Sequence, residues 1–170
     1  MKLELPGWGK TQVACSKQGK SMNAVLWKLP VPSTGLHREP RFYPLRAHDC
    51  CLWWIAEKAE GGGRNEALIF NEVFLYKVSI YRAYPEPIRY LTYDKIVDMG
   101  RTPLLTEVLS LPRAKEAGAT LKHFAISFDT GPLFEFIAET FRFESPFDTG
   151  ALQSEISRRL ASTINPVTGV

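Results

Sequence analysis

The sequence contains no long apolar run, since no segment approaches the roughly 18 apolar residues that a helix needs to span a membrane. Residues 1–10 also lack the apolar stretch of a secretory signal peptide. Cysteine is scarce: Cys15, Cys50 and Cys51 are an odd number, and a disulfide between the two vicinal residues would be strained. We therefore expect a cytoplasmic protein with reduced thiols and no membrane partner.

Motifs for metals and cofactors are missing as well. Cys50 and Cys51 are adjacent rather than separated by two residues, which does not suit a zinc site. Residues 7–11 end in Gly-Lys-Thr, as a phosphate-binding loop does, but Glu4 stands where that loop has its first glycine. No Rossmann glycine pattern, nucleophile elbow or His-Glu-x-x-His sequence occurs. The sequence therefore predicts neither a metal nor a cofactor.

The composition is that of an ordinary globular domain, with 45% hydrophobic, 12% aromatic and 23% charged residues in a chain of 170. The net charge of +3 is unevenly distributed, because residues 1–48 carry eight lysines and arginines against two glutamates. We expect a single domain over residues 1–170, made of a basic N-terminal segment (1–48) and a helix–strand core (49–165).

Hydrophobic periodicity predicts an α+β fold. Asp49 can cap a helix that ends near Gly61, because apolar residues recur after it at a spacing of three to four. Thr102 followed by Pro103 can begin a second helix, and a third starts at residue 148 or 149 and ends before Pro166.

Alternation of apolar residues predicts the strands. Residues 11–14 and 23–28 form short strands, residues 67–84 are β-rich, and residues 121–128 place Phe124, Ile126 and Phe128 on one face and His123 on the other. The expected architecture is a small, mostly antiparallel sheet packed with about four helices.

The basic N-terminal segment is a candidate binding surface. Its cations alternate with aromatic residues, so they could follow a phosphate backbone while rings stack on bases, or they could meet an acidic protein. A solvated face of lysines over core aromatics is the competing interpretation. The candidate binding residues are Lys10, Lys17, Lys20, Arg38 and Arg41.

A second candidate site combines Cys50 with His123. A cysteine in the first turn of a helix is favoured as the thiolate, and an imidazole on a strand packed across the helix start could act as its base. Glu135 is the nearest downstream carboxylate that could orient the imidazole, with Asp129 as a substitute. Pro132 could instead begin a helix and move Glu135 off a strand. The competing interpretation is that the thiols and the imidazole are buried structural groups.

The segments His48-Asp49-Cys50-Cys51-Leu52-Trp53-Trp54 and His123-Phe124-Ala125-Ile126-Ser127-Phe128-Asp129-Thr130-Gly131 resemble papain-like cysteine amidases and peptidases of the NlpC and CHAP type. In those families a helix opens with the cysteine, and a later strand begins with the histidine. The resemblance covers roughly residues 43–136 and implies that Cys50 is the nucleophile, His123 the base and Glu135 the orienting residue. Cys51 departs from the small residue that these families have at its position.

Two functions follow from these observations. The first is a small cysteine hydrolase that cleaves an amide or acyl bond with Cys50, His123 and Glu135. The second is a non-catalytic binding protein, such as an inhibitor, an adaptor or an assembly component of a phage or mobile element. Its basic segment would bind an acidic protein or nucleic acid. The sequence leaves the oligomeric state open.

Overall fold

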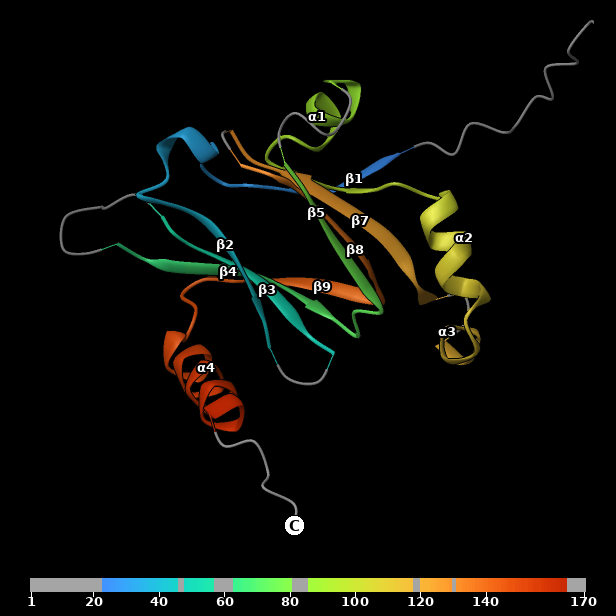
Figure 1. The fold of residues 1–170 in the computed structure, drawn as a ribbon. Coiled ribbons are helices and arrows are strands. Elements are labelled where there is room, and N and C mark those ends of the chain that lie inside the picture. Colours follow the sequence, from blue (N-terminus) through green and yellow to red (C-terminus); the bar gives the residue numbers. More distant parts are fainter. Residues whose placement is uncertain are drawn as a thin grey trace, which may run out of the picture.

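A computed structural model describes residues 23–45, 48–56, 63–80, 86–117, 120–129 and 131–164 of the chain. Strands in these residues form two antiparallel sheets that pack face to face (Figure 1). Sheet A has, in spatial order, β1 (Ala24–Lys28), β6 (Lys95–Asp98), β7 (Lys122–Ser127), β8 (Leu133–Ala138) and β5 (Leu75–Ser79). Sheet B has β2 (Arg38–Pro44), β3 (Cys50–Ile55), β4 (Asn65–Asn71) and β9 (Thr140–Glu144) in that order.

The hydrophobic core lies between the two sheets. Successive side chains of a strand point to opposite faces, so every second residue of the central strands enters this layer. Phe70 of β4 and Phe136 of β8 stack across it with ring centroids 3.9 Å apart. The buried members of this layer are Leu29, Cys50, Leu52, Trp54, Leu68, Phe70, Ile96, Phe124, Ile126, Phe128, Phe134, Phe136 and Ala138.

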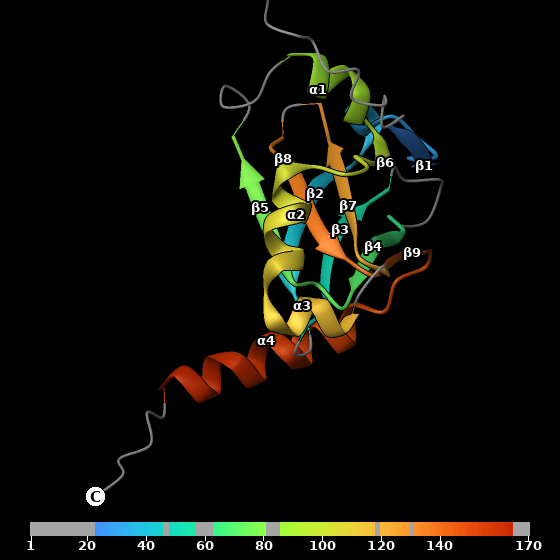
Figure 2. The same ribbon diagram turned by 90° about the vertical axis from the view of Figure 1, so that its right-hand side faces the viewer.

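Helices cover the outer faces of both sheets. Figure 2 shows α2 (Pro103–Ser110) and α3 (Pro112–Ala117) lying across sheet A, where Leu105 and Val108 pack against Ile137. The helix α1 (Glu86–Thr92) lies at one end of sheet A, and a 3₁₀ turn, η1 (Ser33–Gly35), precedes β2. On sheet B, Leu152 of α4 (Thr149–Ile164) packs against Cys51, Ala67 and Ile69.

The expected α+β fold, a small sheet packed with about four helices, is wrong. The protein is mainly antiparallel sheet, arranged in two layers, with short helices at the periphery. The strands β6, β8 and β9, which the sequence analysis did not delimit, supply much of this difference. Phenylalanines from β7 and β8 face sheet B rather than a helix, so the main core joins sheet to sheet.

The helix expected after Asp49 is also wrong, because Cys50 begins the strand β3. One face of β3 lies in the inter-sheet core, and Cys51 on its other face lies under α4. A strand that is buried on both sides has a continuous apolar sequence, and periodicity cannot distinguish it from a buried helix.

Other predicted elements are confirmed. Thr102 begins α2 and accepts the Leu105 N–H with its hydroxyl at 3.2 Å. β7 and α4 occupy the predicted positions, and the β-rich stretch 67–84 contains the end of β4 and the whole of β5. The strand expected at residues 11–14 lies outside the described part of the chain.

Candidate functional site

A buried polar cluster on the outer face of sheet A joins His123 of β7 to Glu135 of β8. His123 Nε2 lies 3.3 Å from Glu135 Oε1, and the other carboxylate oxygen lies 3.3 Å from Nζ of Lys77 on β5. On its opposite side, His123 Nδ1 lies 2.7 Å from the hydroxyl oxygen of Thr102, which caps α2. These contacts connect the helix α2 to three strands of the sheet.

The electrostatics of this cluster favour an ionised carboxylate. The contact from His123 lowers the pKa of Glu135, Lys77 lowers it further, and partial burial acts in the opposite direction. The His123–Glu135 contact has the distance of an ion pair but not the geometry of a hydrogen bond, and Nε2 has no hydrogen-bond partner among the described residues. If the Thr102 hydroxyl donates to Nδ1, then Nε2 carries the ring proton, on the side of the imidazole that lies next to the carboxylate.

The structure therefore brings His123 and Glu135 together but does not bring Cys50 to them. Cys50 lies in the core between the sheets, beside the face of β7 that carries Phe124. His123 alternates with Phe124 and points to the opposite face of sheet A. The body of sheet A thus separates the thiol from the imidazole. His123 is only 3% exposed and Cys50 only 5%, so neither group meets solvent substantially.

The environment of the neighbouring thiol also disfavours a reactive anion. Cys51 is fully buried, and this burial raises the pKa of its thiol to about 12, with Cys50 and Glu144 adding to the shift. Neither cysteine begins a helix, so the helix dipole that was expected to stabilise a thiolate at Cys50 is absent from its position on β3.

A basic face, defined as Arg38, Arg41, Tyr43 and Trp53, lies on the outer side of sheet B. Arg41 is the cross-strand partner of Trp53, and Tyr43 is the partner of Cys51, so these side chains share one side of the sheet. Arg38 would alternate to the other side, but the register shifts between Arg38 and Arg41. This bulge returns Arg38 to the same side, where its Cζ lies 5.9 Å from the Trp53 ring centroid.

The two arginines of this face are solvent-exposed. The ring of Tyr43 meets that of Trp53 edge-on with centroids 6.2 Å apart, and Trp53 Nε1 donates to Asn65 at 3.2 Å. These contacts pack Tyr43 and Trp53 together beneath two exposed guanidinium groups. The other three candidate binding residues, Lys10, Lys17 and Lys20, lie outside the described residues.

The sequence analysis missed the contribution of Trp53 to this face. The alternation of side chains along a strand could have identified it. Leu52 and Trp54 belong to the core, so a strand at this position must direct Trp53 to the other side. A helix was expected over these residues, so this alternation was not considered.

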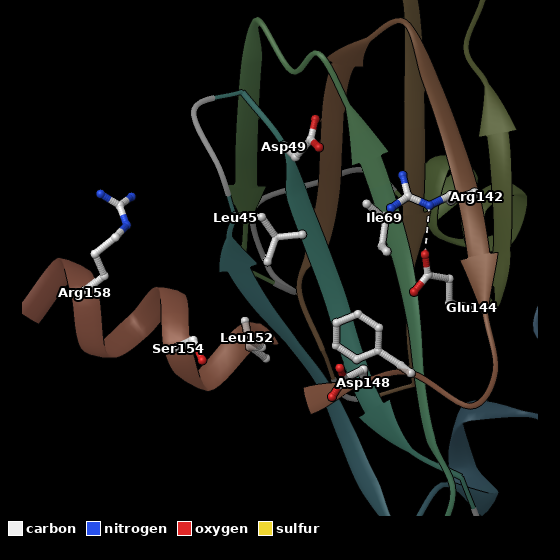
Figure 3. Close-up of a pocket in the computed structure, with 10 residues that line it drawn as sticks. Leu45, Asp49, Ile69, Arg142, Glu144, Asp148, Leu152, Ser154 and Arg158 are labelled. Atoms are coloured by element: carbon white, nitrogen blue, oxygen red, sulfur yellow. Dashed lines mark hydrogen bonds and ion pairs between the residues drawn. The ribbon is translucent and has the colours of Figure 1, made fainter. Parts of the chain in front are cut away.

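A groove of about 860 Å³ lies between α4 and the outer face of sheet B (Figure 3). Leu45, Ile69 and Leu152 provide apolar walls, and the charged groups at its margin have both signs. On β9, Arg142 Nε donates to Glu144 at 2.9 Å, the contact drawn dashed in Figure 3. Its full lining is Leu45, Asp49, Ile69, Arg142, Glu144, Phe147, Asp148, Leu152, Ser154 and Arg158.

Arg142 also belongs to a polar chain across the end of sheet B. One of its terminal nitrogens donates to the side-chain oxygen of Asn71 at 2.7 Å. The Asn71 amide in turn donates to Asp49 at 3.0 Å, and Asp49 accepts the Glu72 N–H at 3.1 Å. Asp49 therefore does not cap a helix, as expected from the sequence, but ties the start of β3 to the end of β4.

Within the residues that the structure describes, no group of three or more histidine, cysteine, aspartate or glutamate side chains could hold a metal ion. The described helices are too short or too polar to cross a membrane. No protein-family model, curated protein or solved structure matches the chain.

Proposed function

We propose that the protein is a non-catalytic binding protein whose basic face docks on a carboxylate-rich protein surface. The observation that carries this proposal is the bulge in β2, which places Arg38 and Arg41 side by side on the aromatic support of Trp53 and Tyr43. Planar guanidinium groups pair with carboxylates in a bidentate manner, and aromatic residues and arginine are typical of interface centres.

Two features favour a protein partner over nucleic acid. The Arg38 guanidinium lies over the Trp53 ring, so the exposed side of the indole is occupied and does not offer a platform for a base. The basic face presents two cations, whereas proteins that follow a phosphate backbone commonly make about 6–10 phosphate contacts.

A cysteine hydrolase has weaker support. Its base and orienting residue, His123 and Glu135, are in contact, but Cys50 lies beyond the sheet from them and is 5% exposed. That function stays a prediction from the sequence, and the rate at which iodoacetamide modifies Cys50 in the native protein tests it.

The proposal is tested with fluorescently labelled poly-L-glutamate and, separately, with a single-stranded oligodeoxynucleotide of similar charge. We expect poly-L-glutamate to bind the wild-type protein in a salt-dependent manner. The double variant Arg38→Glu/Arg41→Glu should bind about tenfold more weakly or worse and show a flatter salt dependence, because rim charges govern association.

The matched control is Lys115→Glu/Lys122→Glu, which reverses two exposed charges on α3 and β7, away from the basic face. This control should bind as the wild type does. Equal binding by the Arg38→Glu/Arg41→Glu variant would refute the role of the basic face. Tighter binding of the oligonucleotide than of poly-L-glutamate would show that the partner is a nucleic acid instead.

A further inference from the structure

The strand β5 forms one edge of sheet A and lies at the margin of the molecule in Figure 2. Its inner neighbour is β8, and no other strand in the described part of the chain pairs with it. An edge strand presents a row of backbone N–H and C=O groups to any strand that approaches it. β5 is therefore a site at which the sheet can be extended.

The side chains on one side of this edge are apolar and exposed. Tyr76 is 50% exposed, Val78 is 45% exposed, and Ile80, which directly follows β5, is 72% exposed. Their spacing of two places Tyr76 and Val78 on the same side, next to Phe42 of β2, whose ring centroid lies 4.6 Å from that of Tyr76. The charged residue of β5, Lys77, lies on the other side of the strand, so this apolar side itself carries no charge.

The other side of β5 carries a single charge. Lys77 points toward Glu135, and their ion pair fixes the ammonium group on the helix-covered side of sheet A. Ser79 lies on the same side as Lys77, two residues further along the strand. The strand thus has one apolar side and one side on which a lysine alternates with a small polar residue.

We propose that two copies of this chain pair through their β5 strands, antiparallel, about a twofold axis at Val78. In this register Val78 faces its symmetry mate, Tyr76 faces Ile80, and Lys77 faces Ser79 of the second copy. The apolar side chains then cover one another, and no two like charges lie opposite. A pairing centred on Lys77 would instead oppose two lysines.

This self-complementarity is the reason to name a second copy as the occupant. A strand from a different protein could bind the same backbone groups. Such binding would not explain why the side chains of β5 are complementary to those of a second, antiparallel copy of β5. Pairing joins the two A sheets into one continuous sheet and covers the β5 edge of each copy. The proposal does not depend on the basic face, because Arg38 and Arg41 lie on sheet B.

Sedimentation velocity on the full chain, from low to high micromolar concentration, tests the oligomeric state. We expect the wild type to shift from monomer to dimer. Val78→Lys places two cations at the axis and should weaken the dimer by about tenfold or more. Because Val78 is 45% exposed, the variant should keep the wild-type circular dichroism spectrum. Tyr90→Lys, on α1 and 72% exposed, is the matched control and should leave dimerisation unchanged.

Two further variants test the register. Ser79→Glu creates two contacts with Lys77 across the axis and should strengthen the dimer, whereas Ser79→Lys should weaken it. Hydrogen exchange of the wild type should show that the amides of residues 76–80 gain protection as concentration rises. A wild-type chain that stays monomeric throughout, or a dimer that Val78→Lys leaves intact, would overturn the proposal. Shifts of both Ser79 variants in the same direction would overturn the register and with it the twofold axis at Val78.

Discussion

His123 and Glu135 make a diagonal contact across β7 and β8. The direct cross-strand partner of His123 is Ile137 and that of Glu135 is Ala125, yet the imidazole Nε2 reaches the carboxylate at 3.3 Å. This geometry requires both side chains to lean toward each other between Thr102 on one side and Lys77 on the other. The cluster therefore holds α2 on sheet A, and its loss should be measurable as a loss of stability.

Replacement of Glu135 by glutamine should destabilise the protein by about 1–3 kcal/mol at pH 7, because a partly buried carboxylate that contacts His123 and Lys77 becomes a neutral amide. The pKa of Glu135 is lowered from its ordinary value of 4.5, so its contribution to the free energy of unfolding is present above that pH and is lost as the pH falls below it. Urea unfolding at pH 7, 5 and 3.5 should show the difference between wild type and variant shrinking toward the lowest pH. Glu144→Gln, which removes an exposed partner of Arg142, should change stability much less. A pH-independent difference would contradict the assignment.

Thr102 links the cap of α2 to the imidazole of His123. Thr102→Val keeps the shape of the side chain but removes the oxygen that accepts the Leu105 N–H and contacts Nδ1. We expect a loss of about 1–2 kcal/mol in the free energy of unfolding, measured by urea titration. Thr102→Ser retains the hydroxyl and should restore most of the stability. A loss in Thr102→Ser with little or none in Thr102→Val would show that the methyl group, not the oxygen, matters.

Glu66 is the buried anion of the inter-sheet region, 3% exposed. Its carboxylate accepts Trp54 Nε1 at 3.0 Å, Arg64 Nη2 at 2.6 Å and the Ser145 hydroxyl at 3.0 Å. In Glu66→Leu the Trp54 Nε1–H loses its acceptor in the core, whereas the Arg64 side chain, which is 60% exposed, can meet water. We therefore expect a loss of about 1–3 kcal/mol in the free energy of unfolding, measured by urea titration. Glu66→Gln preserves part of the network and should lose less. A leucine variant as stable as the wild type would show that the network contributes no net stability.

Thiol labelling distinguishes the hydrolase from the binding protein. Because Cys50 and Cys51 are buried and burial raises the pKa of Cys51 to about 12, we expect iodoacetamide to modify neither in the native protein below pH 8. Both should react after denaturation, which mass spectrometry of the peptides will show. Rapid modification of Cys50 below pH 7 that slows in His123→Gln would contradict this expectation and support the hydrolase.

Much of the secondary structure could be predicted where large apolar residues recur at a regular spacing among small or polar ones. In β7, Phe124 and Ile126 alternate with His123, Ala125 and Ser127, although both faces of the strand are buried, and this alternation located it. Helical spacing of apolar residues located α4. β3 could not be predicted in this way, because it is covered on one side by sheet A and on the other by α4. Its sequence has no polar face from which to infer the period.

The candidate catalytic residues were also only partly predictable from the sequence. Residue type and order suggested His123 and Glu135 as partners, and the pairing of their neighbouring strands places them in contact. Cys50 lies on β3 in sheet B, whereas His123 lies on β7 in sheet A. No local sequence pattern predicts into which sheet a strand will pair, because its partner strands are distant in the sequence.

By itself, the sequence determined which residue types were available, the uneven distribution of charge, and the elements with one apolar face. Only the tertiary structure decided which face each residue occupies and which faces meet. A one-residue shift in β2 brings Arg38 and Arg41 to the same side, and the body of sheet A keeps Cys50 from His123. Strand register and sheet packing set both outcomes, because each side chain's direction follows from its place in a ladder that distant segments complete.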